Sequence, residues 1–180
     1  VVVQLFLIVM VVNLQGITVS RAQEALPGIN AVDAATGSSS IFLGSPSDEM
    51  PPGGYNFTVS IMLDASVSNL FTYQITLAFD KSAVRCNAAW IPTDDSSWVF
   101  HGQTLFVNPA ANIHNEVEQA YVTWGSNLVA KGIDVSPGIL AKANFTAFRT
   151  GSFSIHIVPT EDPTYPFDSV MMDPRQFTIS

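Results

Sequence analysis

The chain has 180 residues, enough for one domain with a substantial hydrophobic core and too few for two comfortable ones. It carries 7 Lys and Arg against 15 Asp and Glu, a formal net charge of −8. Because nucleic acids and anionic membrane surfaces attract basic proteins, this charge argues against both as partners. A single cysteine, Cys86, allows no disulfide within the chain, so the fold must depend on its core.

The first residues differ in character from the rest. Residues 1–12 are almost wholly apolar, and a polar segment with small side chains follows, ending in Ser20-Arg21-Ala22. Small residues three and one positions before a cleavage point after Ala22 are typical of a secretory signal. We expect residues 1–22 to be a signal peptide cut short at its start, or a hydrophobic anchor. Either alternative puts the remaining chain outside the cytoplasm, in the extracellular space or at the cell surface.

Residues 23–37 show no periodicity and are predicted to be a linker. After them, short segments in which apolar and polar side chains alternate are separated by turn residues. Predicted strands cover residues 40–43, 55–63, 71–79, 84–89, 98–101, 104–108, 118–124, 139–148, 153–158, 169–172 and 176–179. We therefore predict that residues 38–180 form an all-β domain, a two-sheet antiparallel β-sandwich with jelly-roll topology and about nine strands.

The segment 71–79 shows this alternation most clearly. One of its faces is apolar, and the other carries Thr72, Gln74, Thr76 and Ala78. The pattern stops at Asp80-Lys81-Ser82, where Asp80 is suited to accept hydrogen bonds from the backbone of a turn. One face is therefore predicted to be core, and the other face is small, polar and uncharged.

The chain contains residue types that often act in catalysis, but they are not arranged in the spacing of a known catalytic or metal-binding motif. His101, His114 and His156 share no metal-ligand spacing, and the chain has no G-x-S-x-G elbow, H-E-x-x-H or Gly-rich phosphate loop. Cys86 lies in a predicted strand and is expected to be a buried, inert thiol. We predict that the chain is not an enzyme.

The acidic residues fall in pairs in predicted loops or at strand starts: Asp94-Asp95, Glu116 and Glu118, and Glu161-Asp162. Without a D-x-[DN]-x-[DN]-G loop, a structural calcium ion is unsupported, and we predict solvated acids and no cofactor. A glycosidase pair is defined by the separation of its carboxylates in space, and nothing in the sequence favours one.

Trp98, in DDSSWVFHG beside a loop, is the candidate for an exposed indole that stacks on a sugar, whereas Trp124 is in phase with Val122 and is predicted to be core. Asn56 and Asn144 each begin an N-F-T glycosylation sequon, and both fall on the outward phase of a predicted strand. The alternative for both Asn residues is an ordinary polar strand face.

Four patterns, in this order, resemble the cohesin domain, the receptor module of cellulosome scaffoldins and related surface proteins. They are PPGGYNFTVSIML, NLFTYQITLAFDKSAV, SPGILAKANFTAFRTGSFSIHI and DSVMMDPRQFTIS. The resemblance covers residues 38–180. It implies a non-catalytic binding or scaffold module whose partner is a dockerin-like or other surface protein, with a link to polysaccharide degradation or cell-surface attachment.

In cohesins the partner docks on a flat sheet face that includes the strand resembling residues 71–79. Matched residue by residue, the contacting positions fall on Thr72, Gln74, Thr123 and Ser126. Many cohesins have Asn and Asp at the first two positions, so this chain lacks the charge-assisted hydrogen bonds of a standard dockerin complex. Three alternatives remain open: a solvated sheet face with no partner, a carbohydrate-binding module that binds polysaccharide, and a filament or pilin-like subunit that retains its hydrophobic N-terminus.

Overall fold

The structure is a computed structural model that describes residues 28–41, 43, 49–105, 110–125, 129, 131–159 and 170–172. The predicted leader, Ser126 and the predicted last strand lie outside these residues, so the expectations about them stay predictions. The described residues form strands and no helix, and none of them forms a helix that could cross a membrane.

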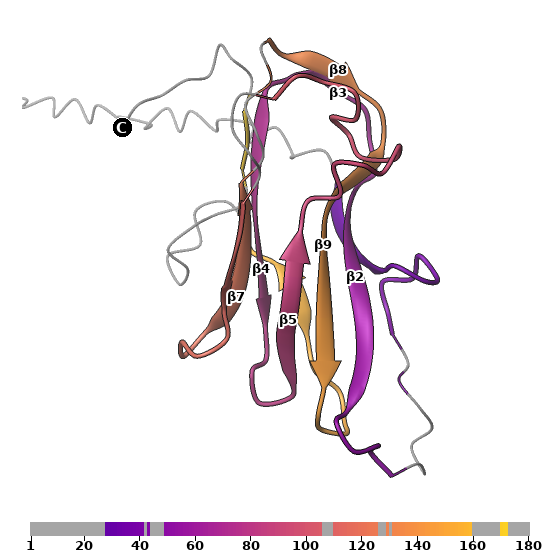
Figure 1. Cartoon of the computed structure of the whole chain (residues 1–180), viewed down its shortest axis with the longest axis vertical. Helices are drawn as coiled ribbons and strands as arrows, with labels where there is room; N and C mark the ends of the chain where they lie inside the picture. Colours follow the sequence, from indigo (N-terminus) through magenta and orange to yellow (C-terminus); the bar gives the residue numbers. More distant parts are fainter. Residues whose placement is uncertain are drawn as a thin grey trace, which may run out of the picture.

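The described strands build two facing sheets (Figure 1). In chain order they are β1 (Ile29–Asp33), β2 (Tyr55–Leu63), β3 (Val67–Leu70), β4 (Thr72–Phe79), β5 (Val84–Trp90), β6 (Ala110–His114), β7 (Ala120–Gly125), β8 (Ile133–Val135), β9 (Gly138–Ala147), β10 (Ile155–Ile157) and β11 (Val170–Met172). One sheet has the order β1-β2-β9-β5, and the other has the order β10-β4-β7-β6 with β11 also paired to β4. The short pair β3–β8 lies at one end of the sandwich (Figure 1).

Every pairing between these strands is antiparallel, and the chain crosses repeatedly from one sheet to the other. Strands β2, β5 and β9 belong to one sheet, whereas β4, β7 and β10 belong to the other. Such crossing connections are typical of jelly rolls. The predicted fold class, an all-β two-sheet antiparallel sandwich, is confirmed.

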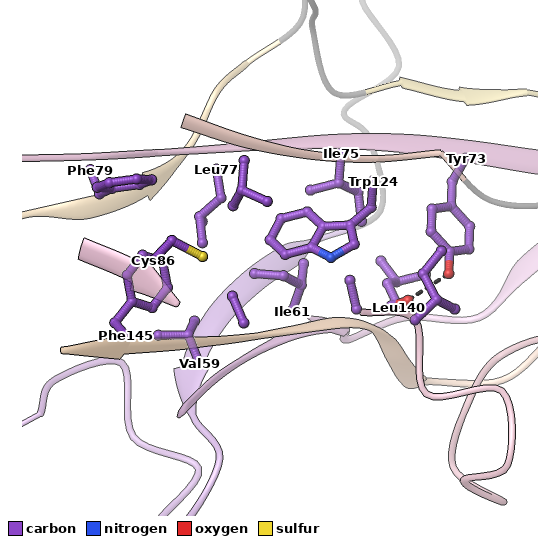
Figure 2. Packing of buried hydrophobic residues seen from close by; sticks show 14 of the residues in the cluster. Val59, Ile61, Tyr73, Ile75, Leu77, Phe79, Cys86, Trp124, Leu140 and Phe145 are labelled. Atoms are coloured by element: carbon purple, nitrogen blue, oxygen red, sulfur yellow. Dashed lines mark hydrogen bonds between the residues drawn. The ribbon is translucent and has the colours of Figure 1, made fainter. Parts of the chain in front are cut away.

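The inner faces of the sheets form one core, as the period of two predicts. Trp124 lies between the sheets beside Ile75 and Ile61, and all three side chains are fully buried (Figure 2). Phe145 stacks on Phe57 with ring centroids 5.6 Å apart. Burying an aliphatic or aromatic side chain of this size stabilises the fold by about 1.5–3 kcal/mol. The core therefore supplies the stability of a fold that has no disulfide.

Cys86 belongs to this core, as predicted. Its thiol is buried, and burial raises the pKa of the thiol to about 12, which keeps it protonated and unreactive near neutral pH. The predicted turn after β4 is also present. The Asp80 carboxylate accepts a hydrogen bond of 2.8 Å from the backbone N–H of Ser82, and hydrogen bonding from Ser82 lowers the pKa of Asp80.

Three local predictions of secondary structure were wrong. Residues 40, 41 and 43 of the predicted strand 40–43 do not belong to a strand. Strand β1 lies inside the predicted linker 23–37, where it pairs with β2 from Ile29 to Asp33. Its five residues are too few, and too often small, for alternation to stand out in the sequence. The first arm of the predicted hairpin around Gly102 is not a strand: Trp98 makes an isolated bridge to Ile139, residues 99–102 form turns, and hydrogen bonds such as Trp98 N–H to Asp95 O (2.9 Å) fold this segment back on itself. Residues 106–108 of the second arm lie outside the described residues.

Candidate binding faces

Strands β4 and β7 are neighbours in one sheet, and their outward side chains form the first candidate face. Thr76 on β4 pairs with Thr123 on β7, and Gln74 pairs with Gly125 one step further along. The residues between them on β4 and β7 point into the core. Thr72, Gln74 and Thr123 therefore lie on one face of this sheet.

Most side chains on this face are buried and therefore inaccessible to a partner. Thr76 and Ala78 are fully buried, and Thr123 is only 7% exposed, whereas Thr72 and Gln74 are half-buried. Tyr121, which points outward two residues before Thr123, is also 7% exposed. Only the end of β4 that carries Thr72 and Gln74 is partly accessible, so Thr123 is poorly placed to touch a partner in this conformation.

Trp98 is not the exposed sugar platform that its position beside a loop suggested. The side chain is 3% exposed, and its indole N–H donates a hydrogen bond of 3.0 Å to the hydroxyl of Tyr73. That hydroxyl in turn donates to the carbonyl oxygen of Leu140 at 2.5 Å (Figure 2). The burial of Trp98 results from a tertiary contact. Val99 and Ser97 make backbone hydrogen bonds to Ile139, and these bonds hold the loop against β9 with the indole inside the core.

The second candidate face is the outer side of the sheet β2–β9–β5. The two N-F-T tripeptides lie directly opposite each other on β2 and β9, in the pairs Asn56 with Thr146, Phe57 with Phe145, and Thr58 with Asn144. The two Phe rings stack inside the sandwich, and the Asn and Thr side chains lie outside. There Thr146 Oγ1 donates to Asn56 Oδ1 at 2.5 Å, and Asn144 Nδ2 donates to Thr58 Oγ1 at 3.4 Å.

These contacts continue to β5. Asn87 Nδ2 donates to Thr146 Oγ1 at 2.7 Å and to Asn144 Oδ1 at 3.1 Å, so one network of amides and hydroxyls crosses three strands. The repeated tripeptide therefore has a structural role, since cross-strand pairs of this kind stabilise a sheet whether or not a sugar is attached. Sequence reasoning placed both Asn residues outward but gave no sign that they lie together.

Trp90 is the exposed tryptophan among the described residues, and the sequence did not single it out. It lies on β5 opposite Lys142 of β9, and its side chain is 39% exposed. Strict alternation from Val84 and Cys86 would point Trp90 into the core. A bulge between Cys86 and Ala88 shifts the phase by one residue and turns Trp90 outward.

Two side-chain contacts lie beside this bulge and beside Trp90. The amide of Asn115 accepts a hydrogen bond of 3.0 Å from the backbone N–H of Cys86 and donates one of 2.9 Å to its carbonyl oxygen. Near Trp90, Lys142 Nζ lies 3.0 Å from Asp95 Oδ2. The pKa of Asp95 is lowered, first by the backbone N–H of Ser97 and then by Lys142.

Acidic and histidine side chains do not converge in the part of the chain that the structure describes. There, no three His, Cys, Asp or Glu side chains come close enough together to hold a metal ion. His114, one of the three histidines considered above, stacks on Tyr121 with ring centroids 4.4 Å apart.

No family model matches the chain, and no curated protein matches it. Its fold is similar to solved structures of cohesins. The second type II cohesin module of the adaptor ScaA scaffoldin of Acetivibrio cellulolyticus is 12% identical, with 81% of this chain and 84% of that chain covered and a TM-score of 0.46. A type II cohesin domain from the cellulosome of the same organism is 15% identical, with 71% and 80% covered and a TM-score of 0.45.

Type II cohesin A11 from Bacteroides cellulosolvens is 16% identical, with 71% of this chain and 83% of that chain covered and a TM-score of 0.44. All three are cohesins, the family that the four sequence patterns resemble. The likeness is one of fold alone, and no partner or activity follows from it.

Proposed function

We propose that this chain is a non-catalytic binding module of an extracellular or cell-surface protein and that it holds a protein partner on the outer side of β4. The observation that carries the proposal is the position of β4. The strand that resembles the docking strand of cohesins lies next to β7 in the sheet, and its outward residues Thr72 and Gln74 are partly accessible. A link to polysaccharide degradation or to surface attachment belongs to the same proposal.

The side chains at this end of β4 determine which hydrogen-bonding groups a partner must present. Hydroxyl and amide groups form neutral hydrogen bonds, each worth about 0.5–1.5 kcal/mol net. Charge-assisted hydrogen bonds are about twice as strong. We therefore expect a partner with uncharged donors and acceptors and a weaker complex than one made through carboxylates.

A capture experiment with a matched control tests this face. The protein is immobilised and exposed to the secreted proteins of its source organism, and bound partners are identified by mass spectrometry. The double variant Thr72→Arg, Gln74→Arg is expected to lose capture, because two long charged side chains block the end of β4. The control Ala88→Arg, Phe148→Arg adds the same charge at two exposed positions away from β4, one on β5 and one just after β9, and is expected to keep it.

Circular dichroism and thermal melting show whether each variant folds. Capture that survives at full strength in the folded Thr72→Arg, Gln74→Arg protein would place the partner elsewhere. Loss of capture only in the control would point to the β2–β9–β5 face instead.

A second candidate function, polysaccharide binding, is favoured by the exposure of Trp90. An exposed indole offers an apolar surface with a hydrogen-bonding edge, and Trp90 lies on the same side of the sheet as the network of Asn and Thr side chains, opposite Lys142. Retention on columns of insoluble polysaccharide tests it. Trp90→Ala should then elute earlier than the wild type, whereas Phe148→Ala, which removes another exposed aromatic side chain, should not. Equal elution of all three proteins would contradict sugar binding at Trp90.

A further inference from the structure

We propose that Asn56, and not Asn144, carries an N-linked glycan in the folded, secreted protein. Both residues begin an N-F-T sequon, and the sequence alone gives no reason to prefer one. The structure distinguishes them by the surroundings of the side-chain nitrogen, the atom to which the sugar is attached.

Asn56 has room for a sugar. Its side chain is exposed near the start of β2, beyond the end of β1, which pairs only with Val59 to Leu63. Its side-chain oxygen accepts the hydrogen bond from Thr146, and its nitrogen makes no hydrogen bond to a described residue. A glycan on that nitrogen leaves the oxygen, and therefore the cross-strand hydrogen bond, in place.

Asn144 is in a different position. It is half-buried on β9, which has β2 on one side and β5 on the other. Its nitrogen donates to the carbonyl oxygen of Phe57 at 3.2 Å and to the hydroxyl of Thr58 at 3.4 Å. Its oxygen accepts from Asn87. A sugar replaces one hydrogen on this nitrogen, so it removes one of these bonds and competes for space with the side chains of Thr58 and Asn87.

The transfer itself follows the usual chemistry. The amide nitrogen of Asn56 forms a bond to the anomeric carbon of a lipid-linked oligosaccharide, the bond from that carbon to the lipid pyrophosphate breaks, and the amide loses one proton. Because transfer to a growing chain precedes folding, the distinction arises at folding. A chain with a sugar on Asn144 cannot complete the β2–β9–β5 sheet and is retained by the cell, whereas a chain modified at Asn56 folds.

Mapping of the modified sites tests the proposal. The 180-residue chain is expressed behind a host secretion signal in cells that contain oligosaccharyltransferase. The secreted protein is treated with peptide N-glycosidase in heavy-oxygen water, and each site is quantified by mass spectrometry. We expect Asn56 to be occupied and Asn144 to be unoccupied.

Three variants distinguish the effect of losing a sequon from the effect of losing a side-chain contact. Thr58→Ala destroys the sequon of Asn56 and should remove the glycan, whereas Thr58→Ser keeps the hydroxyl and should retain it. Thr146→Ala destroys the sequon of Asn144 and removes the hydrogen bond to Asn56 Oδ1, but it leaves the sequon of Asn56 intact and should leave the mass of the glycan unchanged. A glycan on Asn144 in the secreted, folded protein would overturn the proposal, and so would the absence of sugar from both sites.

Discussion

At the scale of single residues, the Tyr73 hydroxyl connects the loop before β6 to the core. It accepts from the indole N–H of Trp98 and donates to the carbonyl oxygen of Leu140. Tyr73→Phe keeps the ring but leaves both partners buried without this bond, so we expect the free energy of unfolding to fall by about 1–3 kcal/mol. Urea unfolding measures the change. The control is Tyr55→Phe, whose hydroxyl has no hydrogen-bond partner among the described residues, and its change should stay within about 0.5 kcal/mol. Equal effects would mean that the bond contributes nothing.

At the scale of elements, the bulge in β5 decides which way Trp90 points, and the Asn115 amide pairs with both backbone groups of Cys86. Asn115→Ala leaves this stretch of the edge strand unpaired. We expect faster hydrogen exchange at the Cys86 amide and a loss of stability of about 1–3 kcal/mol. Asn112→Ala removes an exposed amide from β6, the strand that ends one residue before Asn115, and should change neither quantity. Unchanged exchange at Cys86 in the Asn115 variant would show that β9 alone holds the bulge.

At the scale of the whole molecule, β1 belongs to the sandwich. It pairs with β2 from Ile29 to Asp33, and Ile29 and Ala31 pack against the core. A chain that starts at Gln23 should therefore melt as one cooperative unit. A chain that starts at Ser38 loses β1 and exposes the edge of β2, so it should melt at a lower temperature and aggregate more readily. Thermal unfolding and light scattering of the two chains provide the measurements, and identical behaviour would put the start of the domain after β1.

The local sequence by itself determined which residues of the regular strands face the core. Period two along residues 55–63 and 71–79 predicted the sheets, and it placed Trp124 and Cys86 inside, because side chains on a strand alternate whatever the strand pairs with. The Asp80 turn followed from local hydrogen bonding in the same way. The sequence also placed Thr72, Gln74 and the two sequon Asn residues on outward faces.

Only the tertiary structure decided what those outward faces meet. The two N-F-T tripeptides lie side by side because β2 and β9 are neighbours, although Asn56 and Thr146 are 90 positions apart in the chain. Trp98 is buried because its loop is held against β9, and Trp90 is exposed because a bulge interrupts the alternation. Each of these outcomes depends on contacts between distant segments, and periodicity within a single strand carries no information about them.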